Sequence, residues 1–319
     1  MKTNIEYKPI NISYINEAVN MIMFAYDTER KSIPYLPNYN FYKSIYASIN
    51  GLFSVGNGVV AIQANRLVGF LAGFVVNKFF SRYSGIYCPI FGHGAIGEKR
   101  IEIYQRLYEQ AADLWVKHSH VTHAITVFSH DQDLIESWFW QGFGLRCIDA
   151  IRKTSTVTFK KSPIRIKKLM LADVPTLSGI YTQHKNYFRR SPIFMLKDTE
   201  DVVREHYNSL LKENHHEWIA YHNDIPVGIM SIAPTAETFI ADHPSIMNIN
   251  GAYIVEGERG RGIGTMLLRT VQEWLLLNKY QLCGVDFESI NPLGRGFWMK
   301  YFLPYTYSLV RKIDERLLK

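Results

Sequence analysis

The order of hydrophobic and polar positions predicts a chain that is built from two similar halves. In each half the pattern indicates a strand, helices, a hairpin, a strand, a glycine-rich segment, a long helix, a strand, a short helix and a last strand. The order repeats after about 160 residues, which is the size of a domain and not of a solenoid repeat. We therefore expect a duplicated α/β domain.

The expected elements follow from the periodicity in each half. In the first half we expect strands at 5–12, 84–90, 124–128 and 145–153, a hairpin of 58–63 with 67–76, helices at 15–26, 41–49, 98–118 and 131–141, and a glycine-rich loop at 91–97. In the second half we expect strands at 164–168, 247–255 and 281–287, a hairpin of 218–221 with 226–232, helices at 173–182, 202–213, 265–278 and 292–301, and a closing strand at 305–311. A Lys-Lys-Ser-Pro segment interrupts the pattern near 160–163, so the predicted domains are 1–160 and 161–319.

A glycine-rich turn joins the strand at 247–255 to a strongly amphipathic helix. Residues 259–264 read Arg-Gly-Arg-Gly-Ile-Gly. Backbone N–H groups at a helix start have no intrahelical partner, and glycines allow a phosphate to approach them. No Lys-Ser or Lys-Thr follows and the spacing is not GxGxxG, which excludes a Walker loop and a dinucleotide fingerprint. The turn therefore predicts a pyrophosphate site of another kind.

The pattern Arg-x-x-Gly-x-Gly in this position resembles the GNAT acyltransferase superfamily, which uses the turn to hold the pyrophosphate of acetyl-coenzyme A. Asn291, followed by an aromatic-rich helix with Phe297 and Trp298, resembles the second motif of that family. The whole chain resembles tandem GNAT proteins, of which mycothiol synthase is one kind. The resemblance implies an α/β (α+β) fold with two GNAT-like domains, each a mixed, mostly antiparallel sheet flanked by helices.

The resemblance also implies which residues would bind acetyl-coenzyme A. They are Ile254, Val255, Arg259, Gly260, Arg261, Gly262, Ile263, Gly264, Thr265 and Asn291. The backbone of the first two would contact the pantetheine arm, and the turn would hold the pyrophosphate with backbone N–H groups and arginine charge. Asn291 would bond the pantetheine amide, and Asn-Pro at this point is also expected to cap the following helix.

Acyl transfer to an amine needs a group that removes a proton from the amine. The candidates are Glu256 and Glu288, each at the end of a predicted strand, with Tyr253 as a third. The family commonly places an acidic tyrosine seven residues after its motif asparagine, where this chain has Trp298. Tyr301, one helical turn further on, could protonate the departing thiolate, or a water could, or the thiolate could leave unassisted.

These features predict an N-acetyltransferase that moves an acetyl group from acetyl-coenzyme A to a primary amine in its C-terminal domain. The alternative is a non-catalytic protein that binds acyl-coenzyme A or regulates another. The acceptor would be a small molecule or a peptide. Its site is expected to involve residues 181–190 and the cleft between the domains.

The first half lacks the features that define the second. Its segment 92–97 matches GxGxxG alone, with no arginine or glutamine at the family spacing, and Ser129-His130-Asp131 stands where the motif asparagine would be. We expect a degenerate domain with a structural or acceptor-shaping role, and the alternative is a variant loop that still binds an anion. His93 and His130 are either acid–base groups or ordinary loop histidines.

Composition narrows the choice of partner and compartment. The net charge of +7 suits coenzyme A and would also suit nucleic acid, but no basic block or nucleic-acid motif supports the latter. The three cysteines, Cys88, Cys147 and Cys283, are far apart and odd in number, which argues against a disulfide framework or metal site and for the cytoplasm. The polar segment 1–20 lacks a signal-peptide core, and the longest apolar stretch, 67–76, is too short to span a bilayer.

Overall fold

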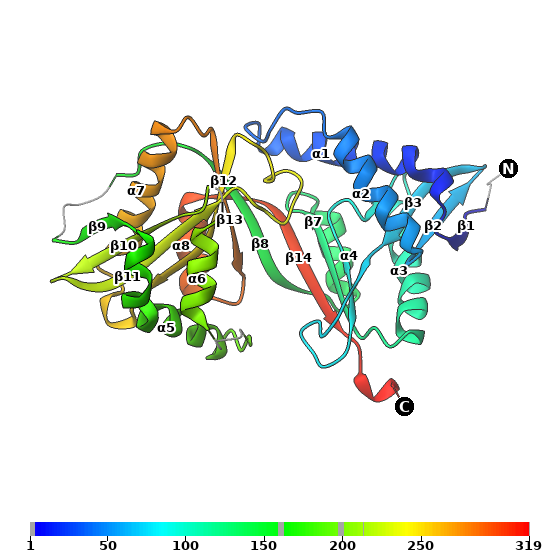
Figure 1. Cartoon of the computed structure of the whole chain (residues 1–319). Coiled ribbons are helices and arrows are strands. Elements are labelled where there is room, and N and C mark those ends of the chain that lie inside the picture. Colours follow the sequence, from blue (N-terminus) through cyan, green and yellow to red (C-terminus); the bar gives the residue numbers. More distant parts are fainter. Residues whose placement is uncertain (1–3, 159–162, 197–200, 213, 319) are drawn as a thin grey trace. The chain divides into compact units, whose positions relative to one another are not determined.

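The computed structural model describes residues 4–158, 163–196, 201–212 and 214–318 (Figure 1). The chain forms two compact units, one of residues up to Ile148 together with Pro304 and beyond, and one from Asp149 to Leu303. The predicted mixed α/β class with mostly antiparallel sheets is confirmed. The predicted domains, 1–160 and 161–319, follow sequence order and stay a prediction, and their boundary lies outside the described residues.

The first unit contains two sheets, with strand orders β1-β2-β3-β6 and β4-β5-β7-β14. Neighbouring strands are antiparallel except for the parallel pair β5 and β7. The elements are β1 (Glu6–Pro9), η1 (Ile12–Tyr14), α1 (Ile15–Ser32), α2 (Tyr42–Val55), β2 (Gly58–Gln63), β3 (Arg66–Ala72), β4 (Phe74–Val76), β5 (Gly85–Cys88), β6 (His93–Ala95), α3 (Arg100–Lys117), β7 (Thr122–Phe128), α4 (Gln132–Trp140), β14 (Leu303–Lys312) and η4 (Glu315–Leu317). β8 (Gly144–Lys153) begins in this unit and ends in the other.

The first unit differs from the sequence prediction in its strand pairing, for example in the division of the predicted strand 67–76 into β3 and β4, which lie in different sheets. The segment 91–97, expected as a loop, contains β6, which pairs with β3 from Gly69 opposite Ala95 to Leu71 opposite His93. The closing strand expected for the second half pairs instead with β7, from Thr306 opposite Phe128 to Lys312 opposite Thr122. An alternating pattern identifies a strand but not its neighbour, because the pairing partner is distant in sequence.

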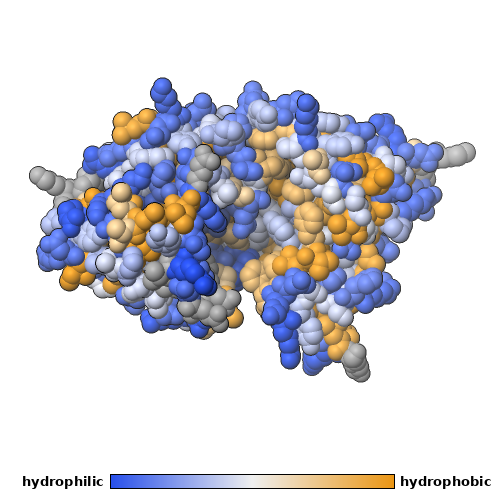
Figure 2. Space-filling model, viewed as in Figure 1, coloured by the Kyte–Doolittle hydropathy of each residue, from blue (hydrophilic) through white to orange (hydrophobic). Residues whose placement is uncertain are grey.

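The long helix α3 closes one face of the first unit. Its buried side chains Ile103, Leu107 and Trp115 pack with strand residues such as Val127 in one apolar cluster. On the face seen in Figure 2, apolar side chains are scattered among polar ones, and single exposed apolar residues of this kind are ordinary in proteins. Among the described helices, none is both long enough and apolar enough to cross a bilayer.

The second unit contains the sheet order β13-β12-β11-β10-β9. Its strands are antiparallel neighbours except for the parallel pair β12 and β13. The elements are β9 (Arg165–Lys168), η2 (Leu171–Leu177), α5 (Ser178–Arg189), α6 (Val202–Leu210), β10 (His216–His222), β11 (Ile225–Ala233), β12 (Ile246–Ile254), η3 (Glu256–Glu258), α7 (Ile263–Leu277), β13 (Leu282–Glu288) and α8 (Pro292–Tyr301).

Helices α5 and α7 cover opposite faces of this sheet. Ile229 and Tyr253 pack in one apolar cluster with Ile180 of α5. The next strand position, Gly228, faces α7, because a Cβ there would lie 3.2 Å from Ile263. Adjacent strand residues point to opposite faces, so the amphipathic stripe of α7 and the apolar side of α5 hold the sheet between them.

Strand β12 separates from β13 at a bulge. The parallel ladder runs from Ile246 opposite Leu282 to Ile249 opposite Val285. Asn250 then interrupts the register with β11, where Ser231 lies opposite Gly251 but the next residue, Ile232, lies opposite Ile249. A bulge of this kind bends a strand and increases its twist. The last part of β12 therefore borders the space in which the candidate site lies.

Candidate functional site

The glycine turn after β12 adopts a backbone that few other residues tolerate. Gly260 and Gly262 both have φ of +79°, in the left-handed region, and Gly262 is the N-cap of α7. The first intrahelical donor is Met266, whose N–H bonds the carbonyl of Gly262 at 3.0 Å. The three N–H groups before it therefore stand at the positive end of the helix, as the sequence predicted for a phosphate site.

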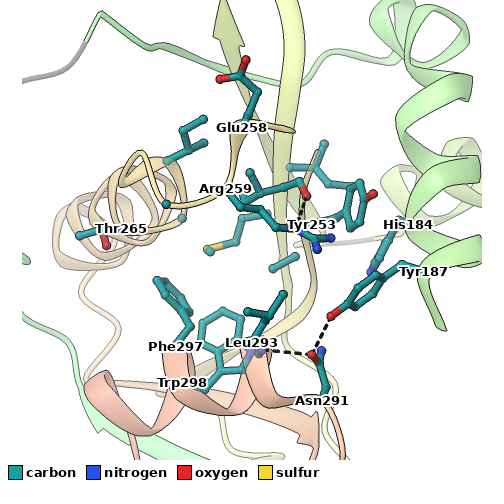
Figure 3. A pocket seen from close by; sticks show the side chains of 18 of the residues that line it. His184, Tyr187, Tyr253, Glu258, Arg259, Thr265, Asn291, Leu293, Phe297 and Trp298 are labelled. Atoms are coloured by element: carbon teal, nitrogen blue, oxygen red, sulfur yellow. Dashed lines mark hydrogen bonds between the residues drawn. The ribbon is translucent and has the colours of Figure 1, made fainter. Parts of the chain in front are cut away.

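A cavity of about 370 Å³ opens beside this turn and extends between β12, α5 and α8 (Figure 3). Its lining includes the predicted cofactor-binding residues Ile254, Arg259, Gly260, Gly262, Ile263, Gly264, Thr265 and Asn291. Among the other lining residues are Tyr253, Glu258, Phe297 and Trp298, together with His184, Tyr187 and Phe188 of α5. The size is in the range of small-molecule sites, and the lining is apolar with a few polar groups.

Two predicted cofactor-binding residues are absent from the cavity lining. The N–H of Val255 donates to the carbonyl of Val227 at 2.9 Å, so it takes part in backbone bonding to β11. Arg261 extends outward, where its Nη1 donates to Oε2 of Glu258 at 3.1 Å. Glu258 also lies 3.2 Å from Nδ1 of His222, so this lining carboxylate has basic partners on two sides.

Asn291 lies at the opposite end of the cavity and caps α8. Its Oδ1 accepts the N–H of Gly294 at 3.2 Å, and Pro292 occupies the first helical turn. The same oxygen accepts a hydrogen bond from the hydroxyl of Tyr187 at 2.8 Å. The predicted capping role is confirmed, and α5 is joined to α8 across the cavity.

Arg259 extends into the cavity and away from the glycine turn. Its Nε donates to the carbonyl of Ile254 at 3.1 Å. Its guanidinium lies 4.7 Å from the ring centre of Tyr187 and 5.6 Å from that of Tyr253. The side chain predicted to add charge at the pyrophosphate therefore lies, in this structure, against an aromatic wall (Figure 3).

The aromatic wall consists of His184, Tyr187, Phe188 and Tyr253, and the sequence predicted only part of it. His184 stacks on Tyr253 with 5.3 Å between ring centres, and Tyr187 lies 6.0 Å from the same ring. Residues 181–190 were expected to shape the acceptor side, but nothing in the pattern singled out His184, Tyr187 or Phe188. Burial raises the pKa of Tyr253, with Arg259 opposing the shift, so its phenol keeps its proton at neutral pH.

Three of the predicted acid–base side chains, Glu256, Glu288 and Tyr301, lie outside the cavity lining, whereas Tyr253, the third candidate base, is part of it. Glu256 is exposed, 3.7 Å from Nη1 of Arg190. Glu288 ends β13 and is half-buried. The hydroxyl of Tyr301 is 3.1 Å from Oγ1 of Thr265, at the start of α7. Trp298, at the position where the resemblance implies a tyrosine, is buried and lines the cavity with an indole that is not an acid.

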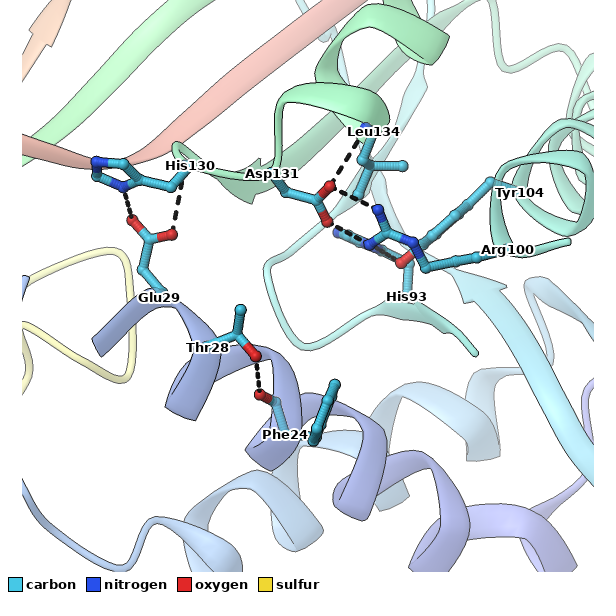
Figure 4. Close-up of polar contacts among 9 residues, drawn as sticks. All are labelled: Phe24, Thr28, Glu29, His93, Arg100, Tyr104, His130, Asp131 and Leu134. Carbon is cyan, nitrogen blue, oxygen red and sulfur yellow. Dashed lines mark hydrogen bonds and ion pairs between the residues drawn. The ribbon is translucent and has the colours of Figure 1, made fainter. Parts of the chain in front are cut away.

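In the first unit an ion pair joins the starts of α3 and α4, which correspond in chain order to α7 and α8. Arg100 begins α3 and pairs with both oxygens of Asp131, the N-cap of α4, at 2.5 and 2.8 Å (Figure 4). His93 is buried behind this pair, with Nε2 2.7 Å from the carbonyl of Thr126 and Nδ1 3.2 Å from the hydroxyl of Tyr104. Burial lowers the pKa of His93 to about 4, so this histidine is neutral. Side chains thus join the two helix starts directly.

His130 is held by a buried carboxylate from α1. Its Nδ1 lies 2.7 Å from Oε1 of Glu29, and Ser129 donates its hydroxyl to the same oxygen at 3.1 Å. Burial raises the pKa of Glu29, and the bonds from His130 and Ser129 oppose the shift. The cluster links α1 to the end of β7, while the imidazole stays half-exposed. No group of three or more metal-ligating side chains lies together within the described part of either unit.

Comparisons with known proteins found one matching family model and several similar folds. Residues 181–291 match the model of the Acetyltransferase (GNAT) family. The fold resembles a GCN5-related N-acetyltransferase from Sphaerobacter thermophilus, with TM-score 0.63, 12% identity, and 97% of this chain and 95% of that one covered. It also resembles a tandem GNAT protein from the clavulanic acid biosynthesis pathway, with TM-score 0.51, 13% identity, and coverage of 97% and 98%. The comparison with curated proteins found no match.

Proposed function

We propose, from the match of residues 181–291 to the acetyltransferase (GNAT) family model and the fold similarity to a tandem GNAT protein, that the chain transfers an acetyl group from acetyl-coenzyme A to a primary amine. One observation carries the proposal. The glycine turn at the start of α7 opens directly onto the cavity, and Asn291 lies at the cavity's far end. A long ligand with a pyrophosphate and an amide-bearing arm fits that order of groups.

The second unit would hold acetyl-coenzyme A through backbone and side-chain groups. N–H groups of Ile263, Gly264 and Thr265 would bond the pyrophosphate, with Arg259 and Arg261 adding charge. The pantetheine arm would follow the end of β12 and reach Asn291. Because the N–H of Val255 is bonded to Val227, the carbonyl of Ile254 is the better-placed backbone contact there.

In the reaction the acetyl carbon would exchange its bond to sulfur for a bond to nitrogen. The lone pair of a neutral amine attacks the thioester carbonyl, a carbon–nitrogen bond forms, and the carbon–sulfur bond breaks. The amine loses a proton to Glu256 or Glu288, acting through water because neither lines the cavity, and coenzyme A leaves as a thiolate that water protonates. The ordinary pKa of a thiol, about 8.5, makes thiolate departure feasible without a dedicated acid.

The first domain would support the second without binding the cofactor itself. The Arg100–Asp131 pair joins the starts of α3 and α4, which correspond by order to α7 and α8. His93 fills the space behind this pair with two hydrogen bonds. Both features favour a degenerate domain. The three widely spaced cysteines, Cys88, Cys147 and Cys283, support a cytoplasmic site of action.

A second function is a non-catalytic protein that binds acyl-coenzyme A. It is favoured by the positions of Glu256, Glu288 and Tyr301, which are all outside the cavity lining. Calorimetric titration of the full chain with acetyl-coenzyme A tests the cofactor site. Release of free thiol in the presence of a panel of primary amines then tests catalysis. Binding without thiol release for any amine would favour the second function, and absence of binding would contradict both.

A further inference from the structure

We infer that the acceptor side of the cavity is an aromatic cation site, and that the substrate carries a second cationic group besides the amine that is acetylated. This inference rests on the proposed function and names its substrate class. It is carried by four rings that contact one another, His184, Tyr187, Phe188 and Tyr253, and by the cation that lies against them. The cation is the chain's own Arg259.

The guanidinium of Arg259 marks where a ligand cation binds. It lies within 6 Å of two tyrosine ring centres, at 4.7 and 5.6 Å, which is the range for attraction between a cation and an aromatic face. Across the described residues no carboxylate lies within ion-pair distance of it. Two tyrosine rings and the carbonyl of Ile254 therefore contact the guanidinium, and a substrate guanidinium or ammonium would find the same groups.

Cofactor binding would free this site. In the proposed complex the pantetheine arm would donate a hydrogen bond to the carbonyl of Ile254, which here accepts one from Nε of Arg259. The pyrophosphate would attract the guanidinium of Arg259 toward the glycine turn. Arg259 directly precedes Gly260 of the glycine turn. Its side chain can therefore contact the pyrophosphate only if it moves away from the rings of Tyr187 and Tyr253. The aromatic wall is then exposed beside the acetyl end of the cofactor.

The group held by the rings cannot be the reacting amine. A cation site stabilises the protonated form and would raise the pKa of an amine bound there, whereas attack on the thioester needs the neutral amine. The nucleophile must therefore be a different nitrogen, which forms the bond to the acetyl carbon as the carbon–sulfur bond breaks. The structure assigns the acceptor to compounds with two basic groups, such as diamines and amino-guanidines.

The first test measures cation binding without the cofactor. In Arg259→Ala the wall lacks its internal cation, and butylguanidinium should bind roughly fivefold or more tightly than its neutral isostere butylurea, as followed by calorimetry. Adding Tyr187→Leu should remove that preference, and adding Tyr187→Phe, which keeps the ring, should retain it. Equal binding of the two ligands, or a preference that survives Tyr187→Leu, would overturn the inference. Tyr253→Leu and Tyr253→Phe provide an independent pair if the first pair alters folding.

The second test uses the wild-type chain and separates this inference from the proposed function. Agmatine should be acetylated with kcat/KM roughly fivefold or more above that of its neutral counterpart 4-aminobutylurea. If both are acetylated equally, the enzyme function stands and the cation site is refuted. If acetyl-coenzyme A does not bind at all, the proposed function fails, while the guanidinium preference of Arg259→Ala still supports or refutes the aromatic site.

Discussion

The hydroxyl of Tyr187 donates a 2.8 Å hydrogen bond to Oδ1 of Asn291, which joins α5 to α8 across the cavity. That oxygen already accepts the N–H of Gly294, so it has no further lone pair for an incoming amide. If this oxygen is to accept an N–H of the pantetheine arm, the cofactor must displace Tyr187. The contact is therefore both a tie between two helices and a competitor for the ligand.

Removing this competitor should strengthen cofactor binding. Tyr187→Phe keeps the ring against Arg259 but lacks the hydroxyl, so acetyl-coenzyme A should bind about two- to fivefold more tightly, the size of one net hydrogen bond. Asn291→Ala should bind it more weakly and should also lose helix capping. Calorimetry on both variants decides the matter, and weaker binding by Tyr187→Phe would show that the phenol contacts the cofactor instead of competing with it.

A charge change at Gly262 should separate electrostatics from backbone strain. Gly262→Asp and Gly262→Asn both force a side chain onto a residue with φ of +79°, and both residue types enter that region more readily than most. Only aspartate brings a negative charge to the start of α7. We expect Asp to weaken acetyl-coenzyme A binding roughly tenfold more than Asn, as measured by calorimetry. Equal affinities of the two folded variants would contradict a pyrophosphate site at this turn.

Much of the fold could be predicted because it depends on local patterns. The stripe of Ile263, Leu267 and Val271 indicates a buried helix, and α7 begins and ends within two residues of the expected bounds. The side chain of Asp131 caps α4, at the first residue of the helix expected over 131–141. The turns of both hairpins have left-handed residues, for example Asn65 and Asn223. Each of these features is set by neighbours in the sequence.

The parts that could not be predicted depend on distant contacts. β6 forms because β3 offers an edge to a glycine-rich segment that has few side chains of its own. The pairing of β14 with β7 joins distant residues, as in Thr126 with Ser308, which are 182 positions apart. In the site, the glycine turn was visible in the sequence, but the direction of the Arg259 side chain was not. It depends on Tyr187 and Tyr253, which come from separate elements.

The first domain should not bind acetyl-coenzyme A. The Arg100–Asp131 pair joins the starts of α3 and α4, which correspond in chain order to α7 and α8, and His93 is buried. Titration of the full chain should therefore give one equivalent of bound cofactor, and Gly262→Asp should lower the affinity of that single site. A stoichiometry near two, or a strong site that survives Gly262→Asp, would place a cofactor site in the first domain.

Acid should destabilise the protein through its buried histidines. Burial lowers the pKa of His93 and of His123 to about 4, from an ordinary value near 6.5. Because the folded-state pKa is depressed, the stability that each neutral histidine contributes is fully present above the ordinary pKa. That stability is lost as the pH falls from about 6.5 toward 4. For one such group the free energy of unfolding should drop by about 2 kcal/mol near pH 5.

Replacing His93 should reduce this pH dependence. His93→Gln removes one titrating group, so urea unfolding at about pH 7.5 and pH 5 should show a smaller loss on acidification than in the wild type. The variant should also be less stable at the higher pH, because the bonds to Thr126 and Tyr104 are disturbed. A loss on acidification equal to that of the wild type would show that His93 does not carry the effect, and His123→Gln would then be the comparison.

Tyr301 should contribute little to the departure of the thiolate. Its hydroxyl is 3.1 Å from Oγ1 of Thr265, at the start of α7, and it is absent from the cavity lining. That contact places the phenol near the proposed pyrophosphate end and not near the acetyl end. Tyr301→Phe should therefore lower kcat by much less than the roughly 10²–10⁴-fold typical of a lost general acid.

Steady-state kinetics can distinguish the two roles of Tyr301. If the hydroxyl only supports Thr265, Tyr301→Phe should raise the KM for acetyl-coenzyme A modestly and leave kcat nearly unchanged, and Thr265→Val should have the same effect, because it removes the same hydrogen bond. If Tyr301 is the acid, kcat should fall by the full factor in Tyr301→Phe but not in Thr265→Val. The alkaline limb of the pH–rate profile should then disappear only in the tyrosine variant, since a proton donor must titrate there and a supporting hydroxyl need not.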